Sequence, residues 1–282
     1  MIKIKLPKIF NINHYYYKNT SLPKNNKKFY EYFKKIGLDK ILFEASQKKI
    51  DLKDNRKSIT PHIPDLYDLY FIYELIRLNN RISILEYGCG WSSLVMHKAL
   101  MANKKENLSK HYKRVKKPYQ LTVVDASKRY IKICYNRIKK FSTDYKFVSM
   151  NFSKAVMTKF NGRYCTEYKD HPLVNPDFIY IDGPSQWHID GKINNFTVNN
   201  YEMVPMLSDV LKYEPFLTPG TIILMDGRAA NSRFLKTNFQ RNWSYQYIKT
   251  SDQHLFWLNE EPLGKWNLQQ INFFKRKNLK SL

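Results

Sequence analysis

Cysteine is scarce in this sequence, and the few cysteines present argue against two structural roles. The 282 residues contain three, Cys89, Cys134 and Cys165, and no two of them are spaced as CxxC. An odd number at such spacings indicates neither a disulfide framework nor a structural zinc site. We therefore expect free thiols in a reducing compartment, and a cytoplasmic protein.

Long apolar runs are lacking as well. No segment approaches the ~20 apolar residues that a membrane span requires. Residues 1–10 mix lysines with apolar residues and are too short for the apolar region and cleavage site of a signal peptide. The sequence therefore predicts no transmembrane segment, while peripheral contact with a membrane stays open. A hydrophobic content of 43% is enough to build a core, so global disorder is not expected.

Acidic residues are few relative to basic ones. Lysine and arginine number 48 against 24 aspartates and glutamates, which gives a formal net charge of +24. Such a charge favours anionic partners, namely nucleic acid, anionic lipid head groups, or phosphorylated and acidic substrates. Most of the charge is lysine, however, and the chain is also rich in Asn, Ile and Tyr. An AT-rich genome produces that composition without selection for binding, so both interpretations stay open.

The first 60 residues predict a helical N-terminal extension. Residues 29–43 begin with helical spacing of apolar side chains, which Gly37 interrupts. Asp65 is then expected to cap a helix over 66–78 that carries an apolar stripe. We expect a catalytic domain over residues 61–265 and a basic C-terminal tail over 266–282.

From residue 82 onward, short apolar runs alternate with helical patterns. Helices are expected after Gly90 and over 130–141, 203–211 and 232–239. Strands are expected over 82–85, 121–125, 145–150, 178–182 and 220–226, with a closing hairpin over 245–249 and 255–258. Continuous apolar strands separated by helices are typical of a parallel sheet covered on both faces. The sequence thus predicts a Rossmann-like, doubly wound α/β fold. Its sheet is mostly parallel, with about seven strands and a C-terminal antiparallel hairpin.

The turn after the first strand, residues 86–93, has the features of a ligand-binding loop. Gly88 and Gly90 let the backbone turn sharply and approach a ligand at the start of the next helix. A dinucleotide-binding turn typically has a third glycine at the position that Ser93 occupies in this chain. The carboxylate of Glu86 offers no favourable contact to a pyrophosphate, whereas it can bind an amino group such as that of S-adenosylmethionine. Asp125 ends the second strand, where an acid can accept both ribose hydroxyls.

Four blocks in this order resemble the class I S-adenosylmethionine-dependent methyltransferases, over roughly residues 65–260. They read ILEYGCGWSS, LTVVDAS, PDFIYIDGP and LTPGTIILMDGR. The resemblance implies S-adenosylmethionine as the cofactor and places Asp182, at the end of the fourth strand, beside the transferred methyl group. It implies these cofactor-binding residues: Glu86, Gly88, Gly90, Trp91, Ser92, Asp125, Asn151 and Asp182.

Two positions depart from the family pattern. The family often has a third glycine where this chain has Ser92. It often has an acid after the third strand to bind the adenine amino group, where this chain has Asn151. The side-chain oxygen of Asn151 is the acceptor that remains for that contact. Trp91 and Trp187 are candidates for stacking on adenine or on the acceptor, or packing residues in a loop.

The acceptor side is expected to follow the fourth and fifth strands. Candidate catalytic residues are Asp182, Asp226 and His188, of which His188 is either a general base or a solvated loop residue. Asp182 and Asp226 could also hold a divalent cation. Some metal-dependent O-methyltransferases use these strand ends, but they usually continue with Asn or Asp where this chain has Gly227, so no metal site is predicted.

Three further residues form the candidate substrate-binding set: Arg228, Asn231 and Arg233. The arginines could clamp a carboxylate or phosphate on the acceptor. Alternatively, Arg228 pairs with Asp226 or Asp182 and fixes the loop.

These patterns predict methyl transfer to an oxygen or nitrogen atom of a small-molecule or glycan acceptor, which could be anionic. Nucleic-acid methylation fits the charge, but the motifs of base-amino, ribose 2′-O and cytosine-C5 methylases are missing. The alternative is a basic module that binds nucleic acid or an anionic membrane without methyl transfer. An oxidoreductase on the same architecture is disfavoured by Ser93 and Glu86.

Overall fold

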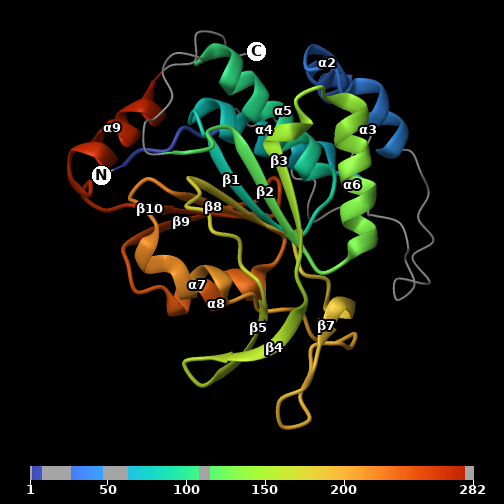
Figure 1. Cartoon of the computed structure of the whole chain (residues 1–282), viewed down its shortest axis with the longest axis vertical. Coiled ribbons are helices and arrows are strands. Elements are labelled where there is room, and N and C mark those ends of the chain that lie inside the picture. The colour runs from blue at the N-terminus through green and yellow to red at the C-terminus, as the bar shows by residue number, and fades with distance from the viewer. Residues whose placement is uncertain (1, 8–26, 47–62, 108–114, 277–282) are drawn as a thin grey trace.

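A twisted seven-stranded sheet forms the centre of the protein (Figure 1). The computed structural model describes residues 2–7, 27–46, 63–107 and 115–276. The strand order is β3-β2-β1-β6-β8-β10-β9, and only β10 runs antiparallel to its neighbours. The strands are β1 (Ser83–Tyr87), β2 (Gln120–Asp125), β3 (Val148–Phe152), β6 (Phe178–Ile181), β8 (Ile222–Asp226), β9 (Trp243–Ile248) and β10 (Gln253–Leu258). The predicted Rossmann-like fold class is confirmed, including the closing antiparallel hairpin.

Helices cover both faces of this sheet, which explains why its central strands are continuous apolar runs. Every residue of β1 and β6 is buried. One face packs against α4 (Leu66–Leu78), α5 (Trp91–Glu106) and α6 (Lys128–Phe141). The other face packs against α7 (Asp209–Tyr213) and α8 (Ala229–Asn238). Figure 1 shows the two helical layers on opposite sides of the strands. Among the described residues, none of the helices combines the length and apolar character required to cross a bilayer.

The N-terminal helices dock on α4. Asp65 caps α4 as predicted, since its side chain accepts hydrogen bonds from the backbone of Tyr67 and Asp68. The predicted helical pattern over 29–43 forms two helices, α2 (Lys27–Lys35) and α3 (Asp39–Ser46), with Gly37 between them at φ +71°. Phe29 and Phe33 of α2 are buried in the core that also contains residues of α4. Residues 8–26 and 47–62 of the predicted extension lie outside the described residues.

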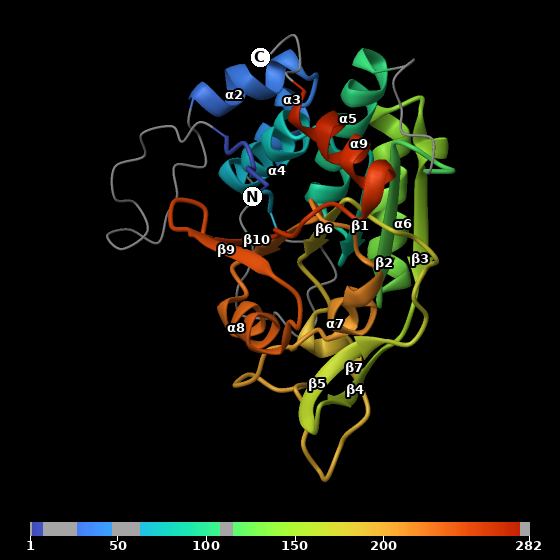
Figure 2. The same cartoon turned by 90° about the vertical axis from the view of Figure 1, so that its left-hand side faces the viewer.

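A second, three-stranded sheet was missed by the sequence analysis. It consists of β4 (Ala155–Phe160), β5 (Arg163–Tyr168) and β7 (Ile189–Asp190), and it projects below the main sheet in Figure 2. Asn161 and Gly162 connect β4 to β5, both with positive φ. Asn-Gly between two extended runs is the signature of a tight hairpin turn, so the sequence carried this signal.

Two predicted boundaries were wrong. The strand expected over 145–150 begins at Val148, after a 3-10 turn η2 (Tyr145–Phe147). The helix expected over 203–211 begins only at Asp209 and continues into η4 (Glu214–Phe216). Pro205 lies inside the predicted helix, where it has no N–H to donate and its ring clashes with the preceding turn. The apolar residues before Asp209 follow an irregular path instead.

The segment after residue 265 is more than a basic tail. Helix α9 (Gly264–Lys275) occupies most of it and buries Ile271, Phe273 and Phe274. Residues 277–282 lie outside the described residues. Helix α9 also lies beside the N-terminal segment, since Lys5 Nζ donates to the carbonyl of Lys275 (Figure 1). The division of the chain at residues 60 and 265 stays a prediction.

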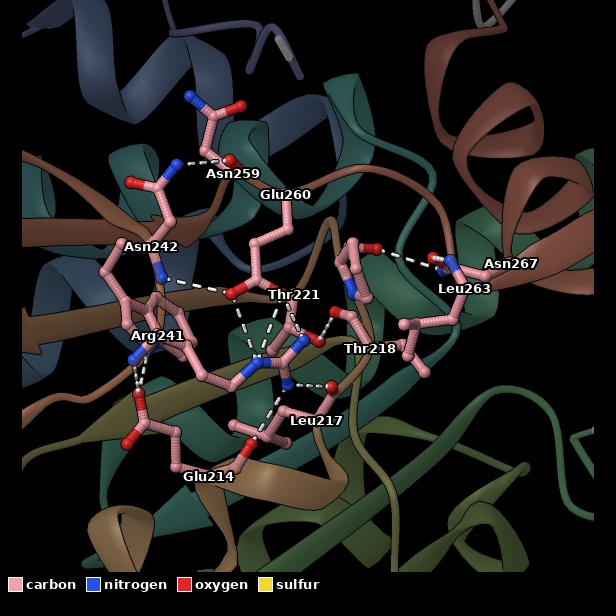
Figure 3. Close-up of polar contacts among 12 residues, drawn as sticks. Glu214, Leu217, Thr218, Thr221, Arg241, Asn242, Asn259, Glu260, Leu263 and Asn267 are labelled. Atoms are coloured by element: carbon pink, nitrogen blue, oxygen red, sulfur yellow. Dashed lines mark hydrogen bonds and ion pairs between the residues drawn. The ribbon is translucent and has the colours of Figure 1, made fainter.

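A partly buried polar cluster fastens the closing hairpin to the rest of the fold (Figure 3). Arg241, just before β9, pairs with Glu260 just after β10. Its guanidinium also donates to the carbonyls of Glu214 and Leu217. Glu214 in turn accepts from the indole N–H of Trp243 at 2.8 Å. This cluster lies at the edge of the sheet where β8 begins, and so leaves the opposite edge for a site.

Candidate cofactor and acceptor site

The carboxyl ends of β1, β2, β3, β6 and β8 lie along one edge of the sheet. The chain order reverses at β1, which has β2 on one side and β6 on the other. In open α/β sheets, ligands bind beyond the carboxyl ends of the strands at such a reversal. The predicted turn after β1, Asp125 at the end of β2 and Asp182 after β6 therefore come together at this edge.

Glycine occupies positions 88 and 90 for different structural reasons. Gly88 has φ +87°, and a Cβ placed on it would lie 2.6 Å from the backbone nitrogen of Gly183. The loops after β1 and β6 touch here, backbone against backbone, so the fold itself requires Gly88. A Cβ on Gly90 would meet only Ser92 Oγ, at 3.7 Å. The space in front of Gly90 is open, and there a ligand could approach the backbone.

Glu86 lies beneath the turn, where its carboxylate is engaged inside the fold, and its predicted contact with the cofactor stays a prediction. Its side chain is fully buried, and its two carboxylate oxygens accept hydrogen bonds from the hydroxyls of Ser92 and Ser93, each at 2.5 Å. Burial raises the pKa of Glu86 well above its usual value. The carboxylate therefore ties the first turn of α5 to β1, where it does not face the open edge. Ser92 and Ser93 are used in the same fastening.

Arg137, which the sequence analysis missed, supports the turn from α6. Its guanidinium carbon lies 3.6 Å from the ring centroid of Trp91, and Nη1 donates to the carbonyl of Gly90 at 3.1 Å. The ring of Trp91, predicted to contact the cofactor, thus carries an arginine on one face. This arrangement favours the packing role for Trp91 and fixes the position of Gly90.

Asp125 bridges two loops at the end of β2. Its carboxylate accepts from the backbone N–H of Cys89 at 2.8 Å and from that of Ser127 at 2.6 Å. Burial raises the pKa of Asp125, although these hydrogen bonds and the nearby His188 partly oppose the rise. The carboxylate is therefore held rigidly beside the glycine turn, where the predicted ribose contact requires it.

His188 lies on the cofactor side of the edge. Its ring packs edge-on against Tyr130 of α6, with centroids 5.8 Å apart, and it lies within electrostatic range of Asp125. The geometry therefore associates His188 with Asp125 more closely than with Asp226. Its predicted role as a general base for the acceptor gains no support.

Asn151, the predicted adenine contact, lies in β3. Its amide nitrogen donates to the carbonyl of Val123 at 3.0 Å, within the sheet. The side-chain oxygen is the atom that remains for an adenine amino group, as the sequence analysis expects. The contact itself stays a prediction.

Aspartates from four separate segments gather at the acceptor side. Asp226 ends β8, and Asp182 follows β6. Gly227 lies next to Asp252 of the β9–β10 turn, with the Gly227 N–H donating to the Asp252 carbonyl at 2.9 Å. Tyr67 in α4 donates to Thr250 of the same turn at 3.0 Å, which brings Asp68 to this cluster.

Burial raises the pKa of Asp226 to about 8, and the charge of Asp182 adds to the rise while Arg228 opposes it. Burial and the neighbouring carboxylates likewise raise the pKa of Asp68. Among the described residues, no three or more His, Cys, Asp or Glu side chains have an arrangement that could hold a metal ion. Asp68 and Asp252 were missed because nothing local in the sequence links them to the strand ends.

Two residues of the predicted substrate-binding set make contacts inside the fold. Arg228 donates to the backbone carbonyls of Asp182 and Pro184, at 2.5 and 3.3 Å. It therefore fixes the loop after β6, which is the alternative considered for it. Asn231 is fully buried and its amide nitrogen donates to the carbonyl of Leu207 at 3.3 Å, so its side chain is held inside the fold. Arg233 is exposed on α8, and its predicted role stays untested.

The strand order and the two helical layers are those of the predicted Rossmann-like, doubly wound fold with a closing antiparallel hairpin. No family model matches the sequence, and no curated protein matches it. One similar solved structure is the O-methyltransferase from Bacillus cereus in complex with SAH, at 12% identity and a TM-score of 0.42. The match covers 79% of this chain and 97% of that chain.

A second similar structure is the SAH-bound Podospora anserina methyltransferase PaMTH1. It is 11% identical to this chain with a TM-score of 0.45, and the match covers 86% of this chain and 100% of that chain. At these identities, the similarity concerns the fold and does not identify an acceptor.

Proposed function

We propose that the protein is a methyltransferase that uses S-adenosylmethionine to methylate an oxygen or nitrogen atom of a small-molecule or glycan acceptor. The observation that carries the proposal is the combination of the open space at Gly90 with the fixed carboxylate of Asp125, at the strand-order reversal. A ligand there meets backbone at the start of α5 and a carboxylate placed for a ribose.

The residues present fit this cofactor in chemical terms. Gly90 would let it approach the backbone, and Asp125 would accept hydrogen bonds from the ribose hydroxyls. Asn151 would accept one from the adenine amino group. When bound, S-adenosylmethionine supplies an electrophilic methyl group on a sulfonium. Glu86 is assigned here to hold the turn, since both of its oxygens already accept from serine hydroxyls.

The acceptor side favours a hydroxyl or amine over an anion. Arg228 is occupied by backbone carbonyls and Asn231 is buried, so two of the three residues considered for an anion clamp are used inside the fold. Aspartate carboxylates converge there instead, and they accept hydrogen bonds from hydroxyl and amino groups. We assign Asp226 as the base that takes the acceptor proton, because a pKa of about 8 is close to the working range of a general base.

Ligand titration tests the cofactor. Thermal unfolding is measured with S-adenosylmethionine, S-adenosylhomocysteine or NAD, and a ligand at 100 times its Kd should add ~2.7 kcal/mol of stability. We expect both adenosyl compounds to stabilise the protein and NAD not to. Gly90→Ala should keep the melting temperature of the free protein, because a Cβ at this position meets only Ser92 Oγ, at an ordinary contact distance of 3.7 Å. The variant should weaken the binding of S-adenosylmethionine, because the added side chain occupies the space proposed for this ligand.

A second measurement tests the transfer. Label from methyl-labelled S-adenosylmethionine is followed into a panel of hydroxyl- and amine-bearing small molecules and glycans. Stabilisation by NAD alone would indicate an oxidoreductase, and no response to any of the three ligands would contradict the proposed function. Binding without transfer to any acceptor in the panel would restrict the proposal to cofactor binding.

A further inference from the structure

A lysine-lined pocket lies at the edge of the sheet opposite the proposed cofactor site. It has a volume of about 590 Å³ and forms where β2 and β3 begin. Lys104 contributes from the last turn of α5, Lys116 and Lys117 from the segment before β2, and Lys146 from η2. A pocket of this size falls within the range of small-ligand sites.

The charge of this pocket has one sign. None of the described residues that line it is acidic. Lys104 pairs with Asp144 at 3.5 Å, and within the described part of the chain no ion pair involves Lys116, Lys117 or Lys146. Like charges around one hollow repel each other, and a multiply charged anion between them relieves that repulsion.

The pocket also has an apolar, aromatic wall. Phe147 is half-buried there, with Lys104 Nζ 4.2 Å and Lys146 Nζ 5.7 Å from its ring centroid. Pro118 lies on the same lining. Lysines beside an aromatic ring form a surface that holds a phosphate and a planar ring together, as in proteins that bind nucleotides in single strands.

A strained residue shapes the floor of the pocket. Tyr119 has φ +64°, a left-handed conformation that is rare for a bulky side chain. The backbone N–H of Tyr119 donates to the carbonyl of Ile82 at 2.5 Å, which anchors it to the core. Strained residues of this kind concentrate at functional sites. The conformation sets the direction in which the chain passes from Lys117 into β2.

We propose that this pocket binds a phosphorylated ligand of nucleotide size, with its phosphates on the lysines and its planar base against Phe147. The ligand is either a free nucleotide or one nucleotide of a single strand, which present the same chemistry. The site is separate from the proposed methyl-transfer site, and it stands or falls independently of that function.

Binding measurements on the full chain test the proposal. The probes are ATP, inorganic triphosphate, a labelled 12-nucleotide single-stranded RNA, and phosphatidylcholine–phosphatidylserine vesicles. We expect ATP or the RNA to bind, and Lys116→Gln/Lys117→Gln to weaken that binding about tenfold or more, because charge-assisted contacts are lost. For the RNA, the salt dependence of log K should fall by about 0.7 for each phosphate contact removed.

The matched control is Lys159→Gln/Lys192→Gln. It makes the same change in net charge at two exposed lysines on or near the inserted sheet. This variant should bind within about twofold of wild type. Phe147→Leu should weaken ATP but leave inorganic triphosphate unchanged, because only ATP carries a base to stack on the ring. Tighter binding of the RNA than of ATP assigns the ligand to a strand, and the reverse assigns it to a free nucleotide.

Three outcomes would overturn the proposal. The pocket variant and the control could bind alike, which would make the attraction one of net charge alone. Vesicles could bind while ATP and RNA do not, which would make the surface a membrane contact. Saturating S-adenosylhomocysteine could abolish ATP binding, which would place ATP in the proposed cofactor site. The first two outcomes are measured in the absence of S-adenosylhomocysteine. They therefore test this pocket independently of the proposed function.

Discussion

Individual residues at the cofactor edge are held by the fold before any ligand arrives. Gly88 is fixed by its contact with Gly183, and Glu86 by two serine hydroxyls beneath the turn. Both residues belong to the motif that indicates a ligand site, but the contacts they make stabilise the conformation of the loop. Gly90 is the partly exposed member of the motif region, and the buried carboxylate of Asp125 is held beside it through the backbone N–H of Cys89. A rigid frame of this kind places the few ligand-facing groups at low entropic cost on binding.

Asp226 predicts a pH dependence of stability. Its pKa is raised to about 8 in the folded protein, whereas an unfolded aspartate titrates at about 3.9. Between these values the folded state holds a proton that the unfolded state has lost, so the free energy of unfolding falls as pH rises. Asp226→Asn removes this titration. The variant should gain stability relative to wild type as pH rises from about 4 to 8.

Denaturant unfolding at a series of pH values measures that difference. Asp190→Asn, an exposed aspartate in β7, is the matched control and should follow wild type throughout. If the Asp226→Asn and wild-type curves ran parallel over this range, the buried, proton-holding Asp226 described here would be wrong.

At the scale of elements, the N-terminal helices are part of the core and not an appendage. Tyr32 of α2 donates a buried hydrogen bond to Glu74 of α4 at 2.5 Å. Its ring packs edge-on against Tyr70, with centroids 4.7 Å apart. Helix α4 in turn brings Asp68 to the acceptor side. Helix α4 thus connects the packing of α2 to the proposed acceptor site.

Removing the Tyr32 hydroxyl should destabilise the protein. Tyr32→Phe keeps the ring but leaves the buried Glu74 carboxyl without its partner, which typically costs about 1–3 kcal/mol. Tyr30→Phe is the control, since Tyr30 contacts Phe43 through its ring and the substitution keeps that contact. Chemical denaturation compares the two. Equal stability of the two variants would show that the Tyr32–Glu74 bond contributes nothing.

At the scale of the whole molecule, one buried arginine joins segments that are distant in sequence. Arg81, between α4 and β1, is 1% exposed. Its guanidinium donates to the carbonyls of Gly220 at 2.8 Å and Asp177 at 3.2 Å, and stacks on Phe274 of α9 at 4.0 Å. Asp177 also accepts from the backbone of Ile82 and Ser83. Residues around β1, β6, β8 and α9 thus meet at one side chain.

Arg81→Met should lose about 1–3 kcal/mol of stability, because the buried carbonyls of Gly220 and Asp177 lose their side-chain donor. Arg81→Lys keeps a charge but lacks the planar fork, and should fall between Arg81→Met and wild type. The comparison is made by urea unfolding, with the exposed Arg129→Met as a control expected within about 0.5 kcal/mol of wild type. If Arg81→Met fails to fold, the stability of Arg81→Lys is the test. Wild-type stability of Arg81→Lys would contradict the role of Arg81 in joining these segments.

What the sequence determined is local and periodic. Asp65 as a cap, the buried strands, the glycine turn and the closing hairpin could all be predicted, because propensity, capping and apolar spacing act over a few residues. The inserted β4–β5 hairpin also carried a local signal in Asn161-Gly162. The helix expected over 203–211 conflicts with a local rule, since Pro205 is unfavourable in the interior of a helix whatever the apolar spacing around it.

Only the tertiary structure decided which side chains face the site. Glu86 and Asn231 have the chemistry of ligand-binding residues, but neighbouring elements bury them. Asp68 and Asp252 carry no motif, yet the docking of α4 and the β9–β10 turn brings them to Asp226. Exposure and convergence depend on strand order and on how helices pack across the sheet. These are contacts between residues far apart in the chain, and no window of sequence contains both partners.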